Sequence, residues 1–174
     1  MITLLQFLII YFLRLHLWKS IPGLNIIKSN FSLKNDNGEI YTDLDIFDFE
    51  DIDNASYVGI FRGIDVDLSN FITLPFLGKS TFKFTIDGKG FVPELLNSKL
   101  EGKIDDLKIK DYNYNNIDIF GDVSDKVFNG TLTVNDENIQ MDFIGLVDYS
   151  NQFIDFDFST NISKANIGKL NLTS

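Results

Sequence analysis

Apolar and polar side chains alternate one for one along much of the chain between residues 81 and 162. In the first such run, Phe82, Phe84 and Ile86 alternate with the polar residues Lys83 and Thr85. Alternation with a period of two places successive side chains on opposite faces of an extended strand, whereas an amphipathic helix repeats about every 3.6 residues. The pattern therefore predicts half-buried β-strands, each with one apolar and one polar face.

Further strand-like segments follow one another with short, turn-forming stretches between them. The Asn35–Gly38 stretch is a tight-turn signal because Asn, Asp and Gly tolerate positive φ, and Asp87–Gly90 is interpreted as another turn. Short connections favour antiparallel pairing of neighbouring strands. We expect an all-β fold of roughly nine or ten mainly antiparallel strands. The predicted strands cover residues 24–33, 40–49, 57–68, 80–86, 100–109, 112–121, 127–134, 139–149 and 153–162.

Composition limits the classes of protein that the chain can represent. With 174 residues, of which 44% are hydrophobic, it is long enough for one ordinary domain or one section of a larger β structure. The formal net charge of −10 argues against nucleic acid and against docking to anionic lipid surfaces by charge alone. It leaves open the binding of single lipids through their apolar tails. The absence of cysteine excludes disulfides and thiolate metal sites.

The N-terminal segment, residues 1–20, differs from the β-rich remainder, residues 21–174. Residues 1–13 are almost entirely apolar, and Arg14, His16 and Lys19 then interrupt the run. This apolar stretch is shorter than the roughly 17–20 residues of a spanning helix, and no positive charge precedes it as in a signal peptide. Three interpretations stay open: a short helix packed on the sheet, a membrane anchor or uncleaved signal, or the boundary of a fragment.

No group in the sequence stands out as catalytic. Asp87–Gly90 lacks the spacing of a phosphate-binding loop, and the acidic run Asp43–Asp53 lacks the Gly and terminal Glu of an EF-hand. His16 is the only histidine and lies in the apolar N-terminal segment. We therefore expect a protein that is not an enzyme and has no cofactor and no metal site. From periodicity alone, the alternating Phe residues are more typical of a β-sandwich core than of a ligand groove.

Several motifs occur in order along the second half of the chain. They are G-x-G-F at 88–91 ahead of Pro93, DYNYNNI at 111–117 followed by Gly121, FNGTL at 128–132, NDENIQMDFIG at 135–145 and ANIGKLNL at 165–172. In order and spacing, residues 88–172 resemble the TamB-like branch of the AsmA-like bacterial envelope proteins, in the form found in Bacteroidetes. Residues 57–86 fit more loosely, and residues 1–20 do not fit. Because such proteins are far longer than this chain, it resembles an internal or C-terminal-region fragment.

The resemblance implies a fold, a location and partners. The fold is an extended, twisted antiparallel β-sheet curled into an open, taco-like apolar groove. Family members are anchored in the inner membrane and cross the periplasm toward the outer membrane, so the implied location is the bacterial cell envelope. They are implicated in phospholipid transport and in assembly of outer-membrane proteins. The implied partners are phospholipid acyl chains and, for a full-length parent, an outer-membrane assembly protein of the Omp85 type.

These features together predict a section of a lipid-transfer conduit between the inner and outer membranes. Two alternatives stay open: a scaffold that assists assembly or secretion of outer-membrane proteins by strand addition at a sheet edge, and a closed β-sandwich with a structural or adhesive role. The residues expected to line the lipid groove are Phe82, Phe84, Ile86, Phe128, Leu132, Val134, Ile139, Met141, Phe143, Val147, Ile154, Phe156 and Phe158.

Overall fold

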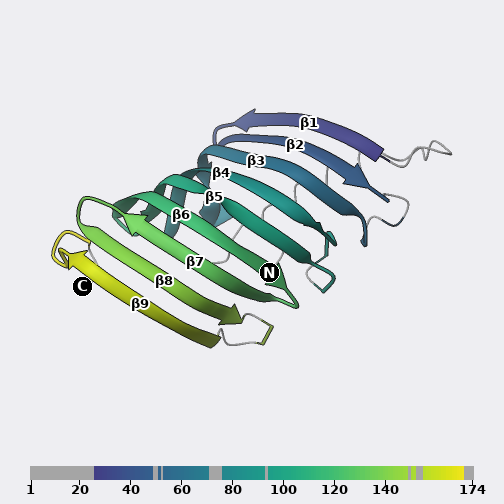
Figure 1. Ribbon diagram of the computed structural model, residues 1–174. Helices are drawn as coiled ribbons and strands as arrows, with labels where there is room; N and C mark the ends of the chain where they lie inside the picture. The colour runs from purple at the N-terminus through teal and green to yellow at the C-terminus, as the bar shows by residue number, and fades with distance from the viewer. Residues whose placement is uncertain are drawn as a thin grey trace.

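The computed structural model describes residues 26–48, 51, 53–70, 76–92, 94–148, 150–151 and 155–170. In this part of the chain nine antiparallel strands form one sheet in sequence order (Figure 1). The strands are β1 (Ile26–Asn35), β2 (Gly38–Phe47), β3 (Ser56–Asp67), β4 (Leu77–Lys89), β5 (Asn97–Ile109), β6 (Tyr112–Ser124), β7 (Val127–Asn135), β8 (Ile139–Asp148) and β9 (Asp155–Ala165). The prediction of an all-β antiparallel fold is confirmed. The helix expected in residues 1–20 lies outside the described residues.

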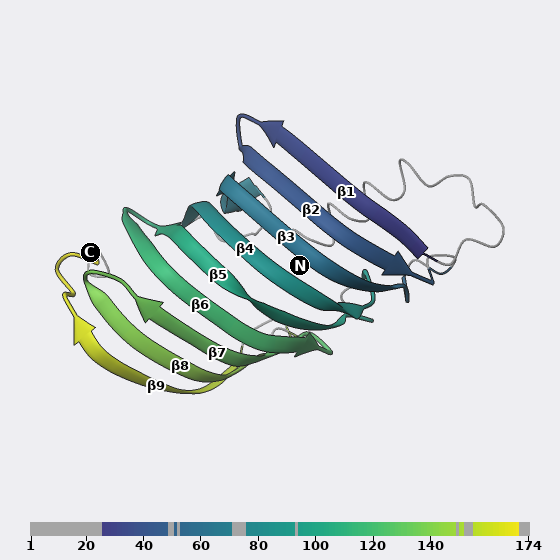
Figure 2. The same cartoon turned by 45° about the horizontal axis from the view of Figure 1, so that its top comes forward.

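The sheet is open, with β1 at one end and β9 at the other. Each strand pairs only with its neighbours in the sequence, and the sheet twists and arches from one end to the other (Figure 2). The described residues contain no second sheet packed on the first, so the two-layer sandwich is not seen in them. Helical structure in these residues is limited to 3-10 conformation at Asp51 and in the short turn η2 (Leu68–Asn70).

The strand register places most of the apolar side chains of the nine strands on one side of the sheet. Phe84, for example, lies opposite Phe61 on β3 and Gly102 on β5. Directly opposite residues on neighbouring strands point to the same side of a sheet, so Phe61, Phe84 and Gly102 belong to the same face. We call this side the apolar face and the other the polar face. On β6 to β9 the apolar face carries Ile117, Ile119, Val123, Phe128, Leu132, Val134, Met141, Phe143, Val147, Phe156, Phe158 and Ile162.

Bulges lie near the rim of the sheet that holds η2 and the β5–β6 and β7–β8 turns. On β3 the register with β4 shifts between Gly63 and Val66, and Asp65 there has a φ of 51°. Asp tolerates this left-handed conformation better than most residues. If side chains alternated strictly between the two faces from Gly63 onward, Val66 would point to the polar face. The extra residue of the bulge returns Val66 to the apolar face, opposite Ser80, where it is buried.

Strand β4 is longer than the sequence pattern predicts. The prediction ended the strand at Ile86 and assigned Asp87–Gly90 to a turn. In the structure β4 continues to Lys89, because Gly88 lies in the ladder opposite Tyr57 on β3 and Ser98 on β5. The left-handed backbone appears only at Gly90, with a φ of 82°. The interpretation of the whole stretch as a turn is therefore wrong.

Candidate apolar binding face

The loop between β4 and β5 covers the apolar face over β2 to β4. Its backbone is tied to the β2–β3 loop by hydrogen bonds from Gly90 N to Ala55 O (3.0 Å) and from Phe91 N to Asp53 O (3.2 Å). The Phe91 ring is buried, with its centroid 4.8 Å from that of Tyr57. Burial also raises the pKa of Tyr57. Phe91 belongs to a core cluster with Leu44, Ile46, Ala55, Tyr57, Ile86 and Leu96.

A second cluster fills the same face nearer to η2. It consists of Ile40, Phe61, Val66 and Phe82, and all four side chains are buried. Phe82 packs against Phe61 with ring centroids 5.3 Å apart and against Phe84 at 5.2 Å. Together the two clusters make the β2–β4 part of the apolar face an ordinary protein core.

Toward β9 the apolar face becomes accessible to solvent. The exposed fractions of Phe156, Phe158 and Ile162 are 59%, 49% and 51%. Neighbouring apolar side chains on β7 and β8 are only partly buried. Contiguous apolar surface of this kind marks interaction sites more often than single exposed residues do. We define the open apolar patch as Phe128, Leu132, Met141, Phe143, Val147, Phe156, Phe158 and Ile162.

Aromatic rings form the surface of the open apolar patch. The ring centroid of Phe158 lies 5.0 Å from that of Phe143 and 6.3 Å from that of Phe156. Such distances are typical of attractive ring pairs. The three rings belong to two adjacent strands, β8 and β9, so they form one apolar surface rather than separate contacts.

A row of glycines runs across the middle of the patch. Gly121, Gly130 and Gly145 lie opposite one another on β6, β7 and β8. A Cβ atom on either Gly121 or Gly130 would come within 2.7 Å of the Phe128 ring. The missing side chains therefore leave room for a ring to lie along the sheet, which keeps this part of the face smooth.

One rim of the patch is closed by the segment that follows β9. Backbone hydrogen bonds from Asn166 N to Asn138 O (2.8 Å) and from Leu170 N to Asn166 O (3.2 Å) hold this segment over the β7–β8 turn. The buried Leu170 side chain packs in a third cluster with Ile117, Val134 and Ile139. This end of the face is therefore filled by the chain itself.

A buried carboxylate stabilises the same rim. Asp136 is 2% exposed and accepts hydrogen bonds from Asn138 N (2.8 Å), from Asn115 N and Nδ2 (3.1 Å each) and from the Tyr112 hydroxyl. Burial alone would raise the pKa of Asp136, but the hydrogen bonds outweigh it and the pKa is lowered. Burial, followed by the bond to Asp136, raises the pKa of Tyr112. These hydrogen bonds join the β5–β6 hairpin to the β7–β8 hairpin and therefore have a structural role. We call Asp136 and its partners Tyr112, Asn115 and Asn138 the rim latch.

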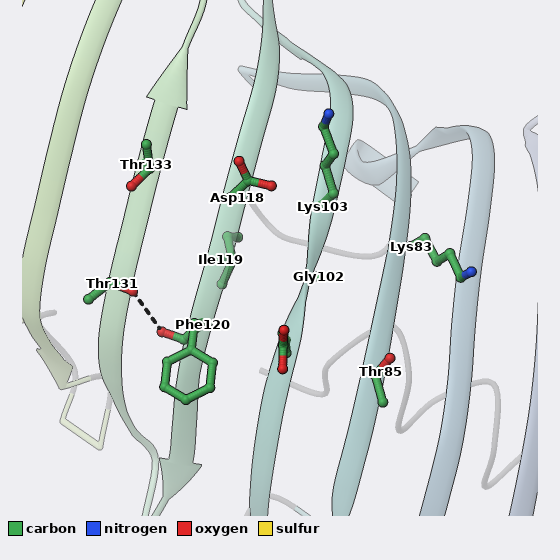
Figure 3. A pocket seen from close by; sticks show the side chains of 10 residues that line it. Lys83, Thr85, Gly102, Lys103, Asp118, Ile119, Phe120, Thr131 and Thr133 are labelled. Carbon is green, nitrogen blue, oxygen red and sulfur yellow. Dashed lines mark hydrogen bonds between the residues drawn. The ribbon is translucent and has the colours of Figure 1, made fainter.

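The polar face carries a hollow of about 510 Å³ over β4 to β7 (Figure 3). Lys103 lies opposite Asp118 there, and Glu101 lies opposite Phe120. The exposed fraction of Phe120 is 60%. Because these side chains point away from the apolar face, the hollow is separate from the open apolar patch. Its lining is Lys83, Thr85, Glu101, Gly102, Lys103, Asp118, Ile119, Phe120, Thr131 and Thr133.

The structure places the predicted groove-lining residues on one face, but in different environments. Phe82, Ile86, Val134 and Ile139 are buried in the three clusters, and Phe84 packs against two of them. Five others, Phe128, Leu132, Met141, Phe143 and Val147, are partly buried, while Phe156 and Phe158 are exposed. The remaining predicted residue, Ile154, lies outside the described residues.

Sequence reasoning missed the residues that decide which part of the face is covered. Phe91 and Leu170 lie in loops or turns rather than in an alternating run, so periodicity gave no signal for them. Asp136 is one of many acidic residues in the sequence and is distinguished only by its partners. Its place in a short polar turn between two strands was the one available hint.

Comparisons of this chain with protein-family models, curated proteins and solved structures gave no significant match. None of the helices among the described residues has the length and apolar character needed to cross a membrane. Within the same residues, His, Asp and Glu side chains do not gather in a group of three that could hold a metal ion.

Proposed function

We propose that the open apolar patch binds lipid acyl chains and that the chain is a section of a conduit that transfers phospholipid between the inner and outer membranes of a bacterial envelope. The observation that carries the proposal is the row of half-exposed side chains on the apolar face of β9, Phe156, Phe158 and Ile162, which the partly buried Phe143 continues on β8. The sequence resemblance described above supports the same function.

The energetics of such a patch suit a long apolar ligand. Burying one CH₂ group contributes about 0.8 kcal/mol, so a chain of many methylenes gains affinity from surface contact without a closed pocket. The contacts of Phe143, Phe156 and Phe158 are apolar and non-directional. An acyl chain could therefore move across neighbouring strands with little change in free energy. A polar face in water and an apolar face against lipid account for the alternating pattern of the strands.

A photo-reactive amino acid at residue 143 tests the proposal. Phe143 lies on the apolar face of β8, between Leu132 on β7 and Thr160 on β9. We expect ultraviolet light to link residue 143 to phospholipid supplied in vesicles or present in a bacterial envelope. The matched control is Ile144, which is the next residue on the same strand, points to the polar face and has an exposed fraction of 61%.

Lipid capture at residue 143 but not at residue 144 would support the proposal. Equal capture at both residues would mean that lipid coats the protein without selecting a face, and the proposal would fail. Capture of unfolded outer-membrane protein at residue 143 without any lipid would instead favour the scaffold function.

A further inference from the structure

Lysine side chains on the polar face lie opposite carboxylates at several positions of the sheet. Lys28 on β1 lies opposite Asp45 on β2, with its Nζ 3.3 Å from Asp45 Oδ2. Lys99 on β5 lies between Asp87 on β4 and Asp122 on β6. Opposite charges in directly opposed positions stabilise a sheet, whereas like charges there destabilise it. These lysines therefore have neighbours of opposite charge within the sheet itself.

One row of the polar face has the reverse arrangement. Arg62 on β3, Lys83 on β4 and Lys103 on β5 lie directly opposite one another, and all three side chains are exposed. None of them forms a salt bridge with another described residue, although the chain has 25 acidic and 15 basic residues. Because the three cations repel one another across adjacent strands, an anion bound between them would stabilise the folded chain.

The cation row, Arg62, Lys83 and Lys103, adjoins the hollow on the polar face. Lys83 and Lys103 line that hollow together with the exposed ring of Phe120 on β6 (Figure 3). Phe120 lies opposite Glu101, two residues along β5 from Lys103. From the spacing of strands and residues, the Cα atoms of Phe120 and Lys103 are about 8 Å apart. The volume of about 510 Å³ is in the range of pockets that hold small organic ligands.

The rest of the lining suits a ligand that carries hydroxyl groups. The carboxylates of Glu101 and Asp118 accept hydrogen bonds, and the hydroxyls of Thr131 and Thr133 both donate and accept them. Lys103 lies opposite Asp118 but forms no salt bridge with it, so its ammonium group is accessible. The two carboxylates disfavour an anion at their own end of the hollow. They therefore direct the anionic part of a ligand toward the cation row.

We propose that the hollow binds a small phosphate ester, with the phosphate group on the cation row and a ring against Phe120. A phosphate group carries a charge of about −1.5 to −2 at neutral pH and offers three acceptor oxygens, so it matches three cations better than a single carboxylate does. The flexible stems of Lys83 and Lys103 let both ammonium groups reach the same phosphate, and the Arg62 guanidinium can bind two of its oxygens.

The charge of the whole chain favours a small ligand over a long polyanion. The formal net charge of −10 opposes the approach of an extended anionic chain. A small ester feels mainly the nearby cation row, because charges beyond about 8 Å are screened at physiological ionic strength. Sugar phosphates and mononucleotides both combine a phosphate, hydroxyls and a ring. This binding is independent of lipid binding, which we assign to the opposite face.

Calorimetric titration with glucose 6-phosphate and with adenosine monophosphate tests the phosphate contact. We expect saturable binding of at least one ester, and Lys103→Gln should weaken it roughly tenfold. The matched control is Lys99→Gln, which removes the same charge from the same face of β5 but between two carboxylates, and it should not weaken binding. Both positions are exposed, so both variants should fold. No saturable binding of either ester, or equal losses in the two variants, would overturn the proposal.

Inorganic phosphate separates the contribution of the ring from that of the charge. Phe120→Ala should weaken ester binding roughly five- to tenfold, because an aromatic side chain gains from stacking on a ring, and it should leave the weaker binding of inorganic phosphate unchanged. Tighter binding of glucose 6-phosphate would identify a sugar phosphate as the ligand, and tighter binding of adenosine monophosphate a nucleotide. Ester affinity that is the same with and without the Phe120 ring would refute the placement of the ligand in the hollow.

Discussion

Phe158 on β9 lies directly opposite Gly145 on β8, and a Cβ atom on residue 145 would come within 2.6 Å of the Phe158 Cβ. Phe82 has the same relationship to Gly63, where a Cβ would come within 2.5 Å of the Phe82 ring. Glycine thus provides the space that large side chains on the apolar face occupy. The position of the Phe158 ring in the open apolar patch depends on a residue with no side chain.

The Gly145→Ala variant should be less stable than the natural chain. The added methyl group has no free space between β8 and β9, and such overpacking typically costs about 1–3 kcal/mol. Urea unfolding would measure the loss. The control is Gly168→Ala, because a Cβ there would meet only Asn166 Oδ1 at 3.9 Å. Equal unfolding midpoints for the two variants would contradict the close contact at Gly145.

Lipid binding should depend on which face carries a substitution. Phe156 and Phe120 are exposed to almost the same extent, 59% and 60%, but lie on the apolar and polar faces respectively. Loss of one well-buried aromatic contact weakens binding roughly 10- to 100-fold, so Phe156→Asp should reduce fatty-acid affinity by about that factor. Phe120→Asp should leave affinity unchanged. Fluorescent fatty-acid titration measures both, with circular dichroism to confirm folding.

The Asp136→Asn variant should destabilise the rim latch. In the variant, the NH₂ group of the new amide side chain would face donors that in the natural chain bond to the Asp136 carboxylate. Loss of hydrogen bonds to a buried charged group costs roughly 2–4 kcal/mol. The exposed carboxylate Asp118, substituted in the same way, provides the control. Urea unfolding near neutral pH should separate the two variants clearly.

The contribution of Asp136 should also depend on pH in a defined direction. Its pKa is lower in the folded chain than in the unfolded chain, where the pKa of Asp is about 3.9. The stabilisation is therefore fully present above that value and is lost as the pH falls through the folded-state pKa. The difference in unfolding free energy between the natural chain and Asp136→Asn should shrink in acid. A difference that stays constant down to strongly acidic pH would show that ionisation of Asp136 is not involved.

The Phe91→Ala variant should disrupt the covered part of the apolar face. Removal of a buried Phe ring typically costs about 3–5 kcal/mol. Phe76→Ala, at a side chain that is 44% exposed, should cost less than about 0.5 kcal/mol. Thermal or urea unfolding compares them. If Phe91→Ala proved as stable as Phe76→Ala, the β4–β5 loop would not be part of the core.

Much of the strand arrangement could be predicted from the sequence. The run from Phe128 to Val134 matches β7 almost residue for residue, because alternation and turn residues act over a few neighbouring positions. The end of β4 was predicted incorrectly because Asp87–Gly90 has the residues of a turn. Its pairing with β3 and β5 outweighs that local preference, and this pairing joins residues far apart in the sequence.

The sequence by itself determined that the protein is a meander of strands and that residues such as Phe143 and Phe156 share a face. This follows because a strand turns its side chains alternately to two sides, and short turns pair neighbouring strands. Only the tertiary structure decided which part of the face is covered and which is open. Phe91 and Leu170 fill parts of the face from loops that fold back over the sheet. The contacts that hold them join distant segments and leave no periodic pattern in the sequence.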